Sequence, residues 1–83
     1  MLKAPSKADM WPRIDPKWAD PGRSGVVNMK GGRFIVFTVL SSTVNGADVL
    51  FLETNMDYAG YTTGSKMTFS WTTEFWHLAK EIE

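Results

Sequence analysis

The fold is decided by residues 33–56, which read RFIVFTVLSSTVNGADVLFLETNM. Two runs rich in β-branched and aromatic residues are separated by Asn45-Gly46, and this is the pattern of a β-hairpin. A type I′ turn needs a positive φ at both central residues, which Asn and Gly tolerate best. The sequence therefore predicts two antiparallel strands joined by a tight turn at Asn45-Gly46.

That turn also sets which residues face one another across the hairpin. The expected pairs are Val44 with Ala47, Val39 with Leu52, and Phe37 with Thr54. Side chains alternate between the two faces of a strand, and both faces of this hairpin are then apolar. One face holds Ile35, Phe37, Val39, Leu50, Leu52 and Met56, and the other holds Phe34, Val36, Leu40, Val49 and Phe51. We therefore expect both faces to be covered, and an apolar patch left open favours a homodimer.

Length and composition set the class of protein. With 83 residues the chain has room for one domain and one modest core. It is 43% hydrophobic and 13% aromatic, which is enough to fold, and it holds no cysteine for disulfides or thiolate metal sites. The longest apolar run is far shorter than the ~20 residues that cross a bilayer, and the first residues lack the apolar core of a signal peptide. We expect a cytoplasmic protein with no membrane partner.

The net charge of zero hides two halves of opposite sign. Residues 1–33 hold seven basic and three acidic residues, which gives +4, whereas residues 34–83 hold two basic and six acidic residues, which gives −4. A basic segment can bind an external polyanion, or the two halves can attract each other within one molecule. The sequence leaves both interpretations open.

Residues 1–24 are predicted to form an irregular arm. Proline removes a backbone donor and disfavours helix at the residue before it, and the arm holds Pro5, Pro12, Pro16 and Pro21. The arm also holds Trp11 and Trp18, which are rarely left in a free tail. It either packs over the hairpin or uses its tryptophans and basic residues to bind a partner.

Residues 25–83 are predicted to form the single folded domain. Strands are expected at about 25–30, 33–44, 47–56 and 66–71, with a loop of polar, glycine and tyrosine residues at 57–65. A helix should follow, since apolar residues recur in one stripe at Phe75, Leu78, Ala79 and Ile82. Trp76 lies beside this stripe, either sealing the core or exposed. The predicted fold class is α+β: a four-stranded antiparallel meander, forming a small, partly open barrel, with a C-terminal helix and an irregular N-terminal arm.

No pattern in the chain predicts catalysis. His77 is the only histidine and there is no cysteine, which excludes Cys–His catalysis and multi-histidine metal sites. No nucleophile motif surrounds any serine, and the carboxylates are scattered. Residues 60–66 are one residue short of a phosphate-binding P-loop and lead into a strand rather than a helix. We expect no enzyme activity, no cofactor and no metal.

A glycine turn, an apolar hairpin and the aromatic segment Phe69–Trp76 running into a terminal helix form a pattern over roughly residues 25–83. This pattern is similar to many small phage and prophage accessory proteins. The resemblance implies a partly open barrel of the Src-homology-3 type and, for a phage-encoded protein, the host cytoplasm. It also implies binding to host proteins, nucleic acid or nucleotides. The arm departs from the pattern.

Three binding functions remain open. The first is a non-catalytic protein-binding module, for which the resemblance implies a phage-encoded inhibitor of a host enzyme or defence factor. Its expected contacts are residue types that dominate interface hot spots: Trp11, Arg13, Trp18, Tyr58, Tyr61 and Trp76. The second is single-stranded nucleic-acid binding, with phosphates neutralised by Arg13, Lys17, Arg23, Lys30 and Arg33, although the zero net charge limits it. The third is capture of a nucleotide by the loop at 57–65.

Overall fold

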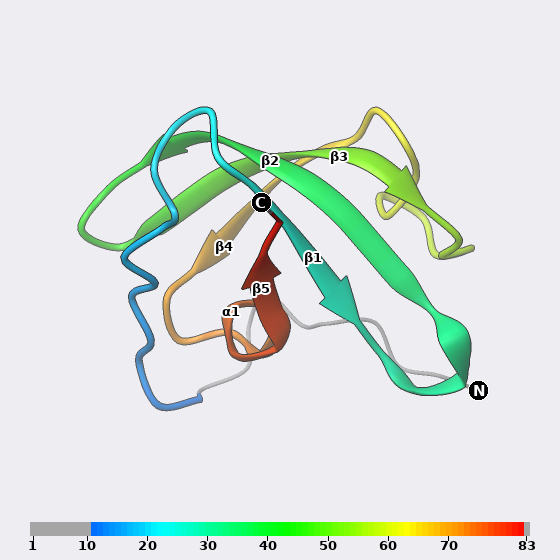
Figure 1. The fold of residues 1–83 in the computed structure, drawn as a ribbon, viewed down its shortest axis with the longest axis horizontal. Helices are drawn as coiled ribbons and strands as arrows, with labels where there is room; N and C mark the ends of the chain where they lie inside the picture. Colours follow the sequence, from blue (N-terminus) through cyan, green and yellow to red (C-terminus); the bar gives the residue numbers. More distant parts are fainter. Residues whose placement is uncertain (1–10, 83) are drawn as a thin grey trace.

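The computed structural model describes residues 11–82, which form one antiparallel sheet of five strands with one short α-helix (Figure 1). The elements are β1 (Ser24–Asn28), the 3-10 turn η1 (Lys30–Gly32), β2 (Phe34–Ser42), β3 (Gly46–Thr54), β4 (Lys66–Ser70), α1 (Glu74–Leu78) and β5 (Ala79–Glu81). Their order in the sheet is β4-β3-β2-β1-β5, and the ladder does not close. The predicted count of four strands is therefore wrong. No helix among the described residues is long and apolar enough to cross a membrane.

The fifth strand replaces the C-terminal part of the predicted helix. α1 ends at Leu78, and Ala79 is already extended, with φ −72° and ψ 139°. β5 then pairs with β1, with Val27 opposite Ala79 and Gly25 opposite Glu81. A short apolar stripe does not by itself distinguish helix from strand. The free edge of β1 favours a strand over a longer helix, because pairing there satisfies backbone N–H and C=O groups that the end of a short helix leaves without hydrogen bonds.

The β2–β3 hairpin forms as predicted, but its turn and register differ from the prediction. Val39 lies opposite Val49 instead of Leu52, and Phe37 lies opposite Phe51 instead of Thr54. Neither central residue of the predicted turn has a positive φ, so the turn is not of type I′. The strands separate after Ser42 and rejoin at Gly46, where Thr43 N–H donates to the carbonyl oxygen of Gly46 at 2.8 Å.

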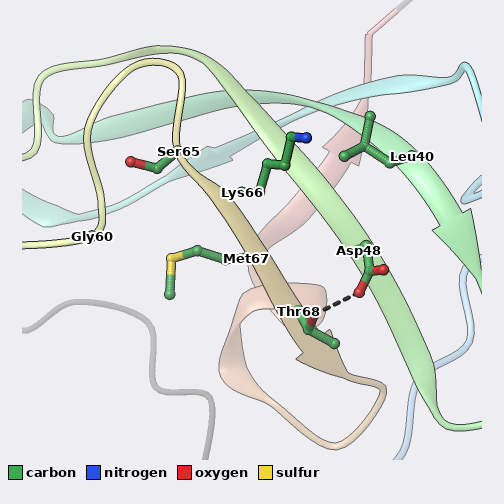
Figure 2. Close-up of a pocket in the computed structure, with 7 residues that line it drawn as sticks. All are labelled: Leu40, Asp48, Gly60, Ser65, Lys66, Met67 and Thr68. Atoms are coloured by element: carbon green, nitrogen blue, oxygen red, sulfur yellow. Dashed lines mark hydrogen bonds between the residues drawn. The ribbon is translucent and has the colours of Figure 1, made fainter.

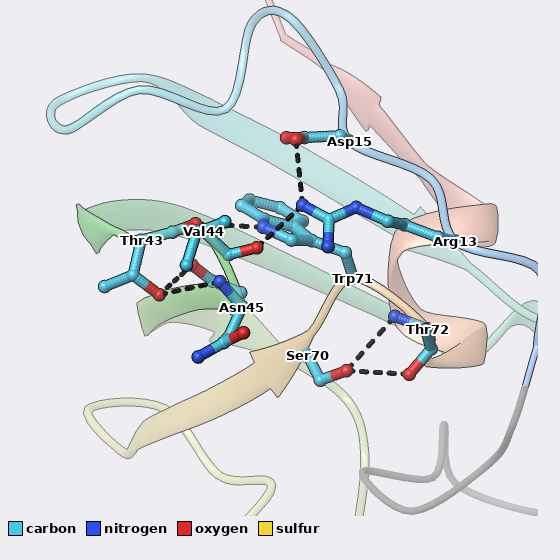
Figure 3. A network of polar contacts seen from close by, with 9 residues as sticks. Arg13, Asp15, Thr43, Val44, Asn45, Ser70, Trp71 and Thr72 are labelled. Atoms are coloured by element: carbon cyan, nitrogen blue, oxygen red, sulfur yellow. Dashed lines mark hydrogen bonds and ion pairs between the residues drawn. The ribbon is translucent and has the colours of Figure 1, made fainter.

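The turn between β2 and β3 is held by contacts with Arg13 of the arm and with Trp71, which follows β4 (Figure 3). Three successive turn carbonyls each accept a hydrogen bond from outside the hairpin: Thr43 from Trp71 Nε1 at 3.0 Å, Val44 from Arg13 at 2.7 Å, and Asn45 from Trp71 N–H at 3.1 Å. Gly46 is needed for space, because a Cβ at this position would strike the carbonyl oxygen of Phe69. These contacts outweigh the local preference for a type I′ turn.

The core lies on the inner face of the sheet, where aromatic rings from the strands meet α1. Phe69 stacks on Phe75 with ring centroids 4.0 Å apart, and Phe37 lies 4.8 Å from Phe75. Figure 1 shows β2 and β3 arching over α1. The observed register gathers one set of buried residues from the two central strands: Ile35, Phe37, Val39, Val49 and Phe51. The predicted division of the hairpin into two faces is therefore wrong for β3.

Residues 1–10 of the predicted arm lie outside the described residues. The described part of the arm packs on this same inner face through Trp18. The ring of Trp18 lies 6.1 Å from the rings of both Phe37 and Trp76. Gly25 makes room for it, because a Cβ there would come within 2.6 Å of Trp18. Since α1 and Trp18 cover the same face, the expectation that both faces of the hairpin are covered is not met by residues 11–82.

Candidate binding surface

The outer face of the sheet, on the side away from α1, carries apolar side chains that the described residues leave uncovered. Leu40 is 41% exposed and Leu52 is 45% exposed, whereas Phe37 and Val49 on the inner face are 0% exposed. Leu50 precedes Leu52 by two residues in β3, on the same outer face, and it is partly exposed. We call Leu40, Leu50 and Leu52 the leucine row. These residues are the candidate contact surface.

Two members of the leucine row are the extra residues of β-bulges. The register between β2 and β3 shifts between Val36 and Phe37, which leaves Leu52 without a partner residue. It shifts again between Val39 and Ser41, which leaves Leu40 without one. A bulge bends its strand and changes the direction of the side chain that it adds. The same irregularities that curve the sheet therefore also set how these two leucines are presented.

A groove of about 750 Å³ lies beside the leucine row, along β4 (Figure 2). Its lining residues are Leu40, Asp48, Gly60, Ser65, Lys66, Met67 and Thr68. Asp48 is held in place across three strands, because its carboxylate accepts hydrogen bonds from Thr68 Oγ1 at 2.5 Å and Ser41 Oγ at 3.1 Å. Lys66 forms no ion pair with any other residue of the described part. The groove thus presents the apolar side chains of Leu40 and Met67, the fixed carboxylate of Asp48 and the ammonium group of Lys66.

The predicted contact residues of the arm have different environments. Trp11 is 38% exposed, and its ring lies 5.0 Å from that of His77. The guanidinium group of Arg13 donates a hydrogen bond to the carbonyl oxygen of Val44 at 2.7 Å and forms an ion pair with the carboxylate of Asp15 at 3.3 Å. Trp18 is half-buried against the core. Of the two tryptophans, Trp11 has the more exposed side chain.

The other three predicted contact residues are Tyr58, Tyr61 and Trp76. Trp76 is 1% exposed, and its Nε1 donates to the carbonyl oxygen of Phe69 at 3.0 Å, so it is a core residue and cannot touch a partner in this fold. The ring of Tyr61 packs 5.8 Å from that of Phe51, and desolvation by burial raises the pKa of its phenol above the ordinary 10.0. Tyr58 lies 6.5 Å from Tyr61 and is partly exposed. The six residues do not form one surface.

All three arginines predicted to bind phosphate form ion pairs inside the chain, Arg13 with Asp15 as described above. Arg23 lies 3.0 Å from Glu81 and Arg33 lies 3.9 Å from Asp57, and both pairs join the basic half of the sequence to the acidic half. Intramolecular attraction between the two halves is therefore present in the fold. Lys17 and Lys30 remain exposed.

Sequence reasoning missed the leucine row because it expected a covering element over each face. One signal was available. Two outer positions of β3, Leu50 and Leu52, are leucines, whereas the buried residues Val49 and Phe51 of the same strand are β-branched or aromatic, the residue types that favour a packed strand. Among residues 11–82, no group of three or more histidine, aspartate or glutamate side chains could hold a metal ion.

Searches against protein-family models, curated proteins and solved structures find no match to this chain. Its function is therefore argued from the geometry described above.

Proposed function

We propose that this chain is a non-catalytic protein-binding module that uses the outer face of its sheet. The observation that carries the proposal is the leucine row, with Leu40 and Leu52 more than two-fifths exposed in the middle of the sheet. Contiguous exposed apolar patches larger than a few hundred Å² are characteristic of interaction sites on soluble proteins. An apolar centre beside polar groups is also the composition of many interfaces.

The surface indicates the chemistry of the partner. Aliphatic or aromatic side chains would cover the leucine row, and a carboxylate would complement the ammonium group of Lys66 at the neighbouring groove. Burying a fully exposed leucine contributes about 1.5–3 kcal/mol, and these leucines are already half-buried. The row alone therefore supports only weak binding, and further contacts in the groove are needed for tight binding.

The order of the strands supports a partly open barrel of the Src-homology-3 type as the scaffold for this surface. β1 to β4 form a meander, and the single turn of α1 carries the chain from β4 at one margin of the sheet back to β1, where β5 pairs. A curved sheet whose last strand returns to its first approaches closure. The resemblance to phage accessory proteins extends the proposal to a host enzyme or defence factor as the partner.

The test is affinity purification from the cells of origin, with nuclease added, using the native chain and substituted chains. We expect Leu40→Lys and Leu52→Lys to lose a protein that the native chain retains. The matched control is Val44→Lys, because Val44 is 74% exposed but lies in the hairpin turn, outside the leucine row. Retention by both leucine variants, or loss of the bound protein on nuclease treatment, would contradict the proposal.

A further inference from the structure

β4 is one of the two edge strands, and the direction of its backbone groups follows from its ladder with β3. In an antiparallel ladder, residue pairs that bond each other alternate with pairs whose N–H and C=O groups point outward. Trp71 N–H donates to Asn45 at 3.1 Å, and Phe51 N–H donates to Ser65 at 2.9 Å. The bonded positions on this side of the ladder are therefore odd-numbered. The N–H and C=O groups of Lys66 and Thr68 consequently point away from β3.

This edge is open within residues 11–82. No backbone hydrogen bond outside the sheet ladders reaches Lys66 or Thr68. At Ser70 the carbonyl oxygen already accepts from Thr73 N–H at 3.1 Å, so only its N–H remains available. Exposed edges of this kind are templates for pairing with another strand.

The opposite edge is protected in ways that β4 is not. β5 is three residues long, and Glu81 within it forms an ion pair with Arg23 at 3.0 Å. Short, charged edge strands resist pairing. β4 has five residues, no proline, and one charged residue, Lys66, at its start. The two edges therefore differ in their capacity to accept a further strand.

We propose that two copies of the chain pair antiparallel through their β4 edges, about a two-fold axis at Thr68, so that the two sheets become one. The edge is self-complementary in this register. Thr68 faces Thr68 of the second copy, and each Lys66 faces Ser70 of the other, which keeps the two ammonium groups about 13 Å apart along the strand. Each Lys66 also lies on the same face of the joined sheet as Asp48 of the second copy, which is on the neighbouring strand β3.

The charges favour a second copy over an unrelated segment, because the groove along this edge contains both a fixed carboxylate and a lysine that forms no ion pair with another residue of 11–82 (Figure 2). Two five-residue strands bury less area than a standard interface of about 1,600 Å². We therefore expect a weak dimer, with a Kd on the order of 100 µM. This inference goes beyond the proposed function, since it depends on the backbone of β4 and not on the leucine row.

Thr68→Pro tests the pairing directly. Proline removes the outward N–H and places its ring at the edge, but it leaves the ladder with β3 intact, since Thr68 N–H does not take part in that ladder. The matched control is Thr68→Val, which loses the same side-chain bond to Asp48 and keeps the N–H. By sedimentation equilibrium from about 10 µM to about 1 mM, we expect the native chain and Thr68→Val to dimerise alike, and Thr68→Pro to dimerise at least about tenfold more weakly.

Amide hydrogen exchange in the native chain gives an answer even where Thr68→Pro does not fold. We expect the amides of Thr68 and Ser70 to exchange quickly in dilute samples and slowly in concentrated ones, whereas those of Met67 and Phe69, inside the ladder, are protected at both concentrations. A native chain that stays monomeric, or a folded Thr68→Pro that dimerises like the control, overturns the proposal. So does protection of Thr68 and Ser70 in the dilute sample, which would mean that the chain covers its own edge.

Discussion

The two faces of the central hairpin are both rich in large apolar residues, yet residues 11–82 bury only one of them. On the inner face Phe37 and Val49 are 0% exposed, whereas on the outer face Leu40 and Leu52 are 41% and 45% exposed. The difference lies in what packs against each face, because α1 and Trp18 both cover the inner one. In this chain the apolar character of a strand does not decide its burial. The number of covering elements does, and the face that the described part of the chain leaves without one is the candidate interface.

The largest expected effect comes from the centre of the inner face. Trp76→Ala should lower the free energy of unfolding by about 3–5 kcal/mol, because it leaves a large cavity beside Phe37, Trp71 and Phe75. Urea denaturation measures this. The matched substitution on the outer face, Leu52→Ala, should cost less than about 1 kcal/mol. Equal losses in the two variants would mean that both faces are packed.

A smaller effect, which sharpens the comparison, is expected within the arm. Trp18→Ala should cost roughly 2–3 kcal/mol, since this half-buried ring covers Phe37 and fills the space left by Gly25. Trp11→Ala should change stability by less than about 1 kcal/mol, because its ring is 38% exposed. Thermal melts of the two variants decide the matter. A loss from Trp11→Ala as large as that from Trp18→Ala would place both rings in the core.

The smallest effect concerns the turn that joins the two central strands. Gly46→Ala should cost about 1–2 kcal/mol, because its Cβ would press against the backbone of Phe69 and Ser70. Asn45→Ala should be nearly neutral, since no positive φ is required there and the ordered contact uses its backbone carbonyl. Denaturation midpoints of the two variants provide the measurement. A larger loss from Asn45→Ala would restore the type I′ turn that the sequence predicts.

Much of the hairpin could be predicted from local sequence. β-branched and aromatic runs favour extended backbone wherever they lie, and alternation correctly placed Ile35, Phe37 and Val39 on one face. The candidate surface could not be predicted in the same way. Whether Leu52 is exposed depends on the register of β3 against β2 and on where α1 packs. Residues far apart in the sequence set both of these.

The sequence by itself determined the strands of the meander, the aromatic composition of the core and the presence of a turn between Ser42 and Ala47. These are consequences of propensity and periodicity, which act over a few residues. Only the tertiary structure decided the bulges at Leu40 and Leu52, the formation of β5 from Ala79–Glu81, and which face of the sheet residues 11–82 leave open. The reason is that each depends on partners beyond the local sequence: the pairing of β2 with β3 for the bulges, the free edge of β1 for β5, and α1 for the covered face.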